Sequence, residues 1–103
     1  MYVGPHWNTM SRSTARIAVI NGCKQPRTVV VEPWADQYTL SPDGSLTVVA
    51  WGDEGQSSVP WFGLVEWDNT TQVYCEETAD FYVEQDGRRL QYGREVEVSV
   101  EGH

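Results

Sequence analysis

The sequence predicts an all-β fold, a single antiparallel sandwich or partly closed barrel of about eight strands. Short runs rich in Val, Thr, Tyr, Trp and Leu recur along the chain, separated by Gly, Pro, Asn and Asp. No segment carries the apolar i, i+3, i+4, i+7 stripe of an amphipathic helix. Strands at roughly eight- to twelve-residue spacing are typical of a sandwich or small barrel. With 103 residues, the chain is long enough for one hydrophobic core.

The N-terminal residues 1–14 are polar and without periodicity, so we expect a flexible tail ahead of a single domain at 15–103. The strands are expected at 15–20, 27–32, 37–41, 45–51, 61–67, 71–75, 80–85, 88–92 and 95–100. The last segment alternates strictly between valine and polar residues. Such alternation is typical of a strand with one buried face and one wet face.

Turn residues indicate how these strands are joined. Asp68–Asn69 and Asp86–Gly87 each separate two apolar runs and predict tight hairpins, because these residue types accept the backbone angles of short loops. Pro42–Gly44 is expected to join its flanking strands in the same way. The connection 52–60 is the one long loop, and we expect it to be mobile.

Apolar residues on the expected inner faces predict the core, because one face of each strand must be buried. These residues are Ile17, Val19, Val29, Val31, Leu40, Leu46, Val48, Leu64, Val73, Phe81, Val83, Leu90, Val96 and Val98. Two of the five tryptophans are expected to be substantially exposed.

One segment, within 17–49, carries a recognisable pattern. It reads Val29, Val30, Val31, Glu32, Pro33, Trp34, Ala35 and Asp36, followed by Tyr38, Leu40, Pro42 and Gly44. The pattern resembles one found in small uncharacterised bacterial β-sandwich proteins, from which it departs by inserting Asp43. The resemblance implies a cupredoxin-like architecture without a copper site, and it implies no activity. Independently of it, Pro33 lacks an N–H and should end its strand or lie at an edge, leaving Trp34 to turn its ring onto the sheet.

Charge is distributed unevenly along the chain, whose formal net charge is -8. Residues 1–31 contain four cations and no acid, whereas residues 32–103 contain all fifteen acids and three arginines. We expect the basic N-terminal strands to lie beside acidic strands and to cancel part of their charge. The acidic balance predicts no nucleic-acid partner, and the short apolar runs predict no membrane span.

The two cysteines, Cys23 and Cys75, are expected to be free and half-buried. No apolar signal peptide is recognisable at the N-terminus, so we expect a cytoplasmic protein with reduced thiols. The neighbouring acids Glu76 and Glu77 should raise the pKa of Cys75 and make it a poor nucleophile.

The sequence contains few residues at the spacings that metal and cofactor sites require. A blue-copper site needs two histidines and a cysteine near one another, but His6 and His103 lie at opposite ends of the sequence. No paired cysteine or histidine spacing of a zinc site is present. We therefore predict no metal and no cofactor. Calcium is the weaker alternative, with oxygen ligands from Asp53, Glu54, Asp68, Glu76, Glu77 and Asp80.

Catalytic constellations are equally sparse. Glu32 and Asp36 offer two carboxylates, which glycoside hydrolysis uses. The structural interpretation is that Glu32 accepts a hydrogen bond from a backbone N–H, Arg16 or Arg27, and we adopt it. No G-x-S-x-G motif and no Gly-rich phosphate loop occur. We predict no catalytic residues and a protein that is not an enzyme.

Tryptophans around the long loop are the strongest indication of function. Trp51, Asp53, Glu54, Trp61 and Trp67 would form an acidic, Trp-bearing surface. Exposed indoles beside polar groups are typical of protein-binding patches, and they also stack on sugar rings. We therefore predict a non-enzymatic interaction module that contacts a protein partner or itself. The alternative is a carbohydrate-binding β-sandwich domain, and in a third interpretation the tryptophans simply fill the core.

Overall fold

The structure is a computed structural model that describes residues 12–92, 94 and 95, and within them the chain forms strands and no helix. The strands are β1 (Thr14–Ile20), β2 (Arg27–Glu32), β3 (Asp36–Leu40), β4 (Ser45–Trp51), β5 (Trp61–Glu66), β6 (Thr70–Glu76), β7 (Asp80–Gln85), β8 (Arg88–Gln91) and β9 (Arg94–Glu95). The first eight begin and end within one residue of their predicted bounds. Most of the predicted strand 95–100 and of the predicted tail lies outside the described residues. Across the described part, no helix is long and apolar enough to cross a membrane.

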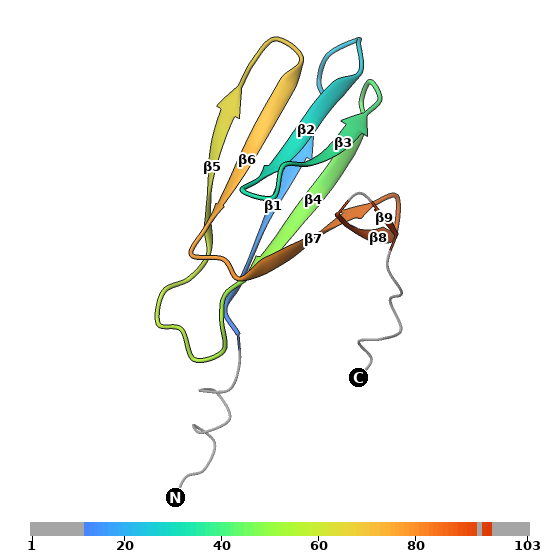
Figure 1. Ribbon diagram of the computed structural model, residues 1–103. Helices are drawn as coiled ribbons and strands as arrows, with labels where there is room; N and C mark the ends of the chain where they lie inside the picture. The colour runs from blue at the N-terminus through green and yellow to red at the C-terminus, as the bar shows by residue number, and fades with distance from the viewer. Residues whose placement is uncertain (1–11, 93, 96–103) are drawn as a thin grey trace, which may run out of the picture.

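Two sheets pack face to face, as Figure 1 shows. Sheet A has the order β1-β4-β7-β8-β9, and sheet B has the order β3-β2-β6-β5. The predicted all-β sandwich is confirmed, and it is not closed into a barrel. Its strands pair antiparallel with one exception, because β2 and β6 run parallel. A wholly antiparallel arrangement is therefore wrong at the centre of sheet B.

Two of the predicted hairpins are confirmed, and one is wrong. β5 pairs with β6 around Asp68–Asn69, and β7 pairs with β8 around Asp86–Gly87. Pro42–Gly44 instead carries the chain from sheet B to sheet A, since β3 pairs with β2 and β4 pairs with β1 and β7. The turn itself forms, with the Gly44 N–H donating to the Ser41 carbonyl oxygen (2.8 Å). The turn residues thus predicted correctly that the chain reverses here, but they did not determine which strands pair with each other.

One core fills the space between the sheets. Nine of the predicted core residues are buried, and Ile17 and Leu90 pack against them while partly buried. Leu64 is wrong as a core residue, because 48% of it is exposed. Val96 and Val98 lie outside the described residues. The core residues that the sequence pattern missed are Tyr38, Ala50 and Cys75. It also missed Val49, which is buried on the outer face of sheet A.

Pro33 ends β2, as expected, and Trp34 turns back onto the other sheet. Its ring packs against the fully buried Phe81 of β7, with ring centroids 4.5 Å apart. Tyr92 meets the same Phe81 ring edge-on at 5.5 Å. This aromatic cluster joins the β2–β3 turn to sheet A, so Trp34 belongs to the core contacts and not to an exposed surface.

Asn21 connects the ends of β1 and β3 from a fully buried position. Its Nδ2 donates to three carbonyl oxygens, those of Gln25 (2.8 Å), Leu40 (3.1 Å) and Ser41 (3.2 Å). Its Oδ1 accepts from the Cys23 N–H (3.0 Å). A buried amide is tolerated only when its donors and acceptors are satisfied, and here one side chain satisfies four backbone groups.

Two cations of the basic N-terminal part pair with acids, as expected. Arg16 of β1 reaches across β4 to Glu84 of β7 (3.2 Å), and Arg27 of β2 pairs with Glu66 of β5 (2.7 Å). The first pair is exposed, whereas only 11% of the Arg27 side chain is exposed. The charge asymmetry of the sequence is therefore partly cancelled by two ion pairs that each span one intervening strand, β4 in sheet A and β6 in sheet B.

Candidate functional site

The five predicted site residues lie on two different faces of the sandwich. Trp61 begins β5 and Trp67 directly follows it, so both belong to sheet B. Trp51 ends β4 in sheet A. Asp53 and Glu54 are exposed in the loop that leads from β4 to β5. The structure brings Trp61 and Trp67 onto one strand but does not bring Trp51 to them.

Trp51 points outward from sheet A and is half-buried there. Its ring packs on Tyr82 with centroids 5.8 Å apart, and the Arg89 guanidinium lies 3.7 Å from the centre of the Tyr82 ring. This stack covers the outer surface of sheet A, where Val49 is only 2% exposed. Trp51 therefore has a packing role on the opposite side of the molecule from β5.

The loop 52–60 is held by side-chain hydrogen bonds. Gln56 Oε1 accepts from the Asp53 N–H (2.9 Å), and Gln56 Nε2 donates to the carbonyl oxygens of Ser58 (2.9 Å) and Glu77 (2.8 Å). A Cβ at Gly52 would lie 2.3 Å from the end of the Gln56 side chain, so a larger residue there would displace that side chain from its hydrogen bonds. The expected mobility of this loop stays a prediction, but the loop is cross-linked to the β6–β7 connection.

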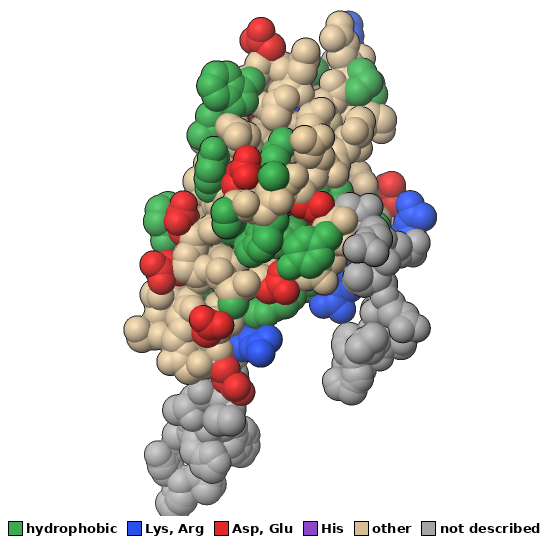
Figure 2. Space-filling view, viewed as in Figure 1, with side chains coloured by type: hydrophobic (Ala, Val, Ile, Leu, Met, Phe, Trp, Pro, Cys, Tyr) green, Lys and Arg blue, Asp and Glu red, His purple; other side chains and the backbone are tan. Residues whose placement is uncertain are grey.

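The strand β5 presents the largest exposed apolar residues near the predicted site. Trp61, Val65 and Trp67 share its outer face, with 56%, 38% and 61% of each residue exposed. Gly63 lies between them opposite Tyr74, and a Cβ there would meet only the Tyr74 Cβ at 3.9 Å. In Figure 2, hydrophobic side chains follow the left edge of the molecule, where Figure 1 places β5. The outer face of β5 is therefore a row of indoles and valine with a small residue at its centre.

The inner face of the same strand is also incompletely covered. Leu64 pairs with Val73 of β6, which is fully buried, yet Leu64 itself is 48% exposed. Phe62, two residues earlier on the same face, still packs against the core, so the cover of this face ends between Phe62 and Leu64. Strand β5 thus exposes apolar surface on both sides at Leu64 and Val65.

Trp67 is exposed but well fixed. Its backbone N–H donates to the Thr70 carbonyl oxygen (2.7 Å), and its indole Nε1 donates to Gln72 Oε1 (2.8 Å). Gln72 Nε2 donates in turn to Glu32 Oε2 (3.2 Å). A ring held in one orientation loses little conformational entropy on binding, which favours a binding role.

Arg27 holds the tip of the β5–β6 hairpin from inside the sandwich. Its Nε donates to the buried Thr71 Oγ1 (2.8 Å), and its Nη2 donates to Glu66 Oε1 (2.7 Å). Its guanidinium also donates to the carbonyl oxygens of Trp67 (2.9 Å), Asp68 (3.1 Å) and Thr70 (3.1 Å). The planar fork of an arginine suits such a cluster of acceptors. Arg27 therefore positions Trp67 and satisfies Glu66 at once.

The candidate catalytic groups do not assemble. The Glu32 side chain lies on the outer face of sheet B, where it accepts a hydrogen bond from Gln72. Asp36 lies directly opposite the buried Val31 and therefore on the inner face, and it accepts a hydrogen bond from the Tyr38 hydroxyl. The two carboxylates therefore lie on opposite faces of the sheet and cannot share a substrate. The expected Arg16 and Arg27 partners of Glu32 are wrong, because those arginines pair with Glu84 and Glu66.

The cysteines are both free, but neither is half-buried as expected: Cys23 is exposed and Cys75 is buried. Burial raises the pKa of the Cys75 thiol from 9.0 to about 12, and the charge of Glu76 adds to the effect. The predicted rise in the pKa of Cys75 is confirmed, although burial contributes more than the neighbouring acid.

The calcium alternative is without support. Within residues 12–92 and 94–95, no three His, Cys, Asp or Glu side chains come together as metal ligands.

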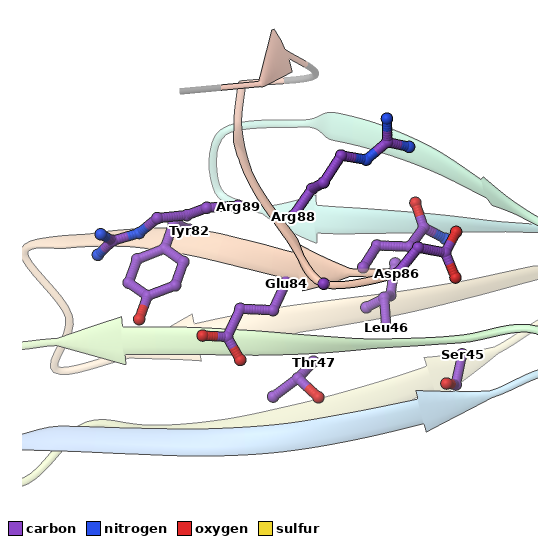
Figure 3. Close-up of a pocket in the computed structure, with 10 residues that line it drawn as sticks. Ser45, Leu46, Thr47, Tyr82, Glu84, Asp86, Arg88 and Arg89 are labelled. Carbon is purple, nitrogen blue, oxygen red and sulfur yellow. The ribbon is translucent and has the colours of Figure 1, made fainter. Parts of the chain in front are cut away.

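Apart from the surface at β5, a hollow lies on sheet A at the β7–β8 hairpin. It has a volume of about 460 Å³ and is lined by Ser45, Thr47, Tyr82, Glu84 and Arg89 among others. Figure 3 shows these side chains, with Arg89 extending over Tyr82 and away from the hairpin tip. Its lining is more polar than apolar, with acids, arginines and hydroxyls beside Leu46 and Tyr82, whereas ligand pockets are predominantly apolar. We therefore place the candidate site at β5.

Leu64 and Val65 are site residues that sequence reasoning missed. The signal was present, because both faces of 61–67 carry large apolar residues, with Leu64 and Phe62 on one and Trp61 and Val65 on the other. A strand that is apolar on both faces is normally central and buried. Here it lies at an edge, and that position turns a core pattern into an exposed one.

Comparisons with known proteins do not identify a relative. No family model matches the chain, and no curated protein or solved structure is significantly similar to it. The resemblance of residues 17–49 to small bacterial β-sandwich proteins therefore stays a prediction.

Proposed function

We propose that the chain is a non-enzymatic binding module whose strand β5 takes up an extended segment of a protein partner. The observation that carries this proposal is the exposure of large apolar residues on both faces of one edge strand. Trp61, Val65 and Trp67 lie on the outer face, and Leu64 lies on the inner face. An edge strand also offers backbone N–H and C=O groups to a further strand.

The usual protections of a sheet edge are missing from β5. Natural edges carry lysines, prolines or bulges that prevent pairing with other chains. Strand β5 contains no lysine and no proline, and its register with β6 is continuous over all six residues. Its single charge, Glu66, is already engaged by Arg27. The edge is therefore open to a partner strand.

Carbohydrate binding is the second candidate, favoured by the exposed indoles of Trp61 and Trp67 on one flat face. Indole rings stack on sugar rings in the same way as they pack on apolar side chains. A sugar on the outer face would leave the exposed Leu64 and the open backbone edge without a role. A protein segment added to the strand uses all three features, so we prefer it.

A reducing compartment, the cytoplasm, is the location that we propose. The exposed Cys23 thiol would be open to oxidation or disulfide exchange elsewhere. Thiol labelling of the protein in freshly lysed cells should find both cysteines reduced, and a Cys23 adduct or disulfide would contradict this location.

Selection of displayed random peptides tests the binding proposal. Peptides with alternating apolar residues should be enriched on the wild-type chain, because such peptides can place one face over the Trp row. Val65→Lys puts a charge in the middle of the row and should weaken the selected peptides about tenfold or more.

Thr39→Lys is the matched control, since Thr39 is exposed on the other edge strand of the same sheet. It should leave peptide affinity unchanged. The proposal fails if no peptide is enriched, or if the selected peptides bind Val65→Lys as tightly as wild type. Quenching of tryptophan fluorescence by soluble oligosaccharides, lost in Trp61→Ala, would instead support the carbohydrate alternative.

A further inference from the structure

We propose that the partner strand is β5 of a second copy of this chain, paired antiparallel across a two-fold axis at Leu64. This inference rests on the proposed function and names the partner. It is carried by the direction of the backbone groups along β5, by the side chains that a symmetric pairing would bring together, and by the charge at this edge of the sandwich.

The backbone groups that face the open edge belong to alternate residues. The Trp67 N–H donates to the Thr70 carbonyl oxygen of the neighbouring strand, so residue 67 points toward β6. Since successive residues of a strand point to opposite sides, the N–H and C=O groups of residues 65, 63 and 61 also face β6. The groups that remain for a partner strand are those of Phe62, Leu64 and Glu66.

One symmetric register uses all of these groups. When Leu64 lies opposite Leu64 of the second copy, Phe62 lies opposite Glu66, and all three residues of each strand fall in hydrogen-bonded pairs. A shift by two residues leaves one of the three beyond its counterparts, and a shift by one turns the free groups away from each other. The open edge of β5 is therefore self-complementary about Leu64.

The same register matches the side chains on both faces. On the outer face it sets Trp61 opposite Trp67 of the second copy and Val65 opposite Gly63, so a bulky residue meets a small one. On the inner face the two exposed Leu64 side chains meet at the axis. Cross-strand apolar and aromatic pairs of this kind stabilise a sheet, and all four large exposed residues of the strand would be covered.

Charge also permits two copies to meet at β5. Each chain has a net charge of -8, so two copies repel one another over most of their surface. Strand β5 carries only Glu66, which Arg27 neutralises at 2.7 Å. Two copies can therefore meet at β5 without opposing uncompensated like charges, and the two-fold pairing closes the edge against further growth.

Light scattering coupled to size exclusion measures the predicted dimer, at twice the 11.7 kDa mass of the chain. Leu64→Pro removes an N–H that only the second copy would use, and proline is tolerated on an edge strand whose N–H faces solvent. This variant should dissociate about tenfold or more readily while keeping its tryptophan row. Thr39→Lys on β3 should remain dimeric.

Cross-linking tests the register. In a Cys23→Ser background, Leu64→Cys places two thiols on residues whose Cα atoms lie about 5.5 Å apart, so a short bismaleimide should link the copies. Trp67→Cys is the matched control, because its two thiols would lie about 20 Å apart along the paired strands. Efficient linking through residue 67, or a dimer that persists in Leu64→Pro, would place the contact elsewhere and overturn the inference. A monomer at every concentration that still binds selected peptides at β5 would overturn it and leave the proposed function standing.

Discussion

The two edges of sheet B differ in a way that explains where this molecule can bind. Strand β3 turns Leu40, fully buried, and Tyr38, 6% exposed, into the core, and its exposed outer residues Gln37 and Thr39 are polar. Strand β5 has a similar length but exposes apolar residues on both faces. The two strands differ chiefly in cover, because the core buries both inner apolar residues of β3, whereas on β5 it covers Phe62 in part and leaves Leu64 half exposed.

The comparison shows that an apolar pattern reports burial only when something covers it. Leu40 and Leu64 both lie on inner-face positions, opposite Arg27 and Val73 respectively. Leu40 is sealed by the core, whereas Leu64 projects beyond it. A partner bound at β5 would cover Leu64 with apolar side chains, as the core already covers Leu40.

The largest expected effect is the contrast between Leu40→Ala and Leu64→Ala. Leu40→Ala opens a cavity in a sealed site and should lower the free energy of unfolding by about 2–5 kcal/mol. Leu64→Ala removes a side chain that is about half exposed and should cost the monomer less than about 1.5 kcal/mol. Urea unfolding of both variants below the concentration at which the chain associates measures the difference. Equal losses would mean that Leu64 is covered within a single chain.

The next contrast concerns the two polar clusters that hold these edges. Asn21→Ala leaves four backbone groups at the β3 end without their side-chain partner. It should lower the free energy of unfolding by about 2–3 kcal/mol. Arg27→Lys keeps the charge but loses the planar fork, and it should cost about 1–2 kcal/mol because water can reach the hairpin tip. Chemical unfolding at neutral pH compares them. The Arg27 variant should also broaden the Trp67 indole N–H signal in an NMR spectrum, which Asn21→Ala should leave sharp.

Thiol reactivity measures how firmly β5 covers its neighbour. Cys75 lies opposite Phe62 of β5 and is buried, so a thiol reagent should modify Cys23 quickly and Cys75 slowly. The folded thiol has a pKa near 12 instead of 9.0, so above pH 9.0 the unfolded chain releases a proton that the folded chain keeps. Stability should therefore fall as pH rises from 9.0 toward 12, and Cys75→Ala should reduce that slope. Rapid modification of both cysteines in the folded protein would mean that β5 opens readily.

The smallest effect is expected at the edge of the other sheet. The ion pair between Arg16 and Glu84 spans β4 in an exposed position, so Glu84→Gln should cost less than about 1 kcal/mol and still less at high salt. Thermal unfolding at low and high ionic strength measures it. A loss that exceeds that of Arg27→Lys would mean that this exposed ion pair contributes more to stability than surface pairs normally do.

Strand positions were predictable because local patterns specify them. The valine run 29–31, the stop at Pro33 and the hairpin at Asp86–Gly87 all depend on neighbouring residues alone. Partner choice was less predictable, because Pro42–Gly44 reverses the chain whether or not its flanking strands pair. The parallel contact of β2 with β6 joins segments about forty residues apart, and no local pattern carries that information.

The sequence by itself determined that the chain is all-β, where its strands begin and end, and that Trp61, Val65 and Trp67 share a face. Those features follow from the two-residue period of a strand and from residue chemistry. Only the tertiary structure decided which strands lie at an edge, that Trp51 and Trp61 occupy opposite sides of the molecule, and that Leu64 is exposed. Burial depends on what the other sheet covers, and that is a property of the packed layers rather than of any one strand.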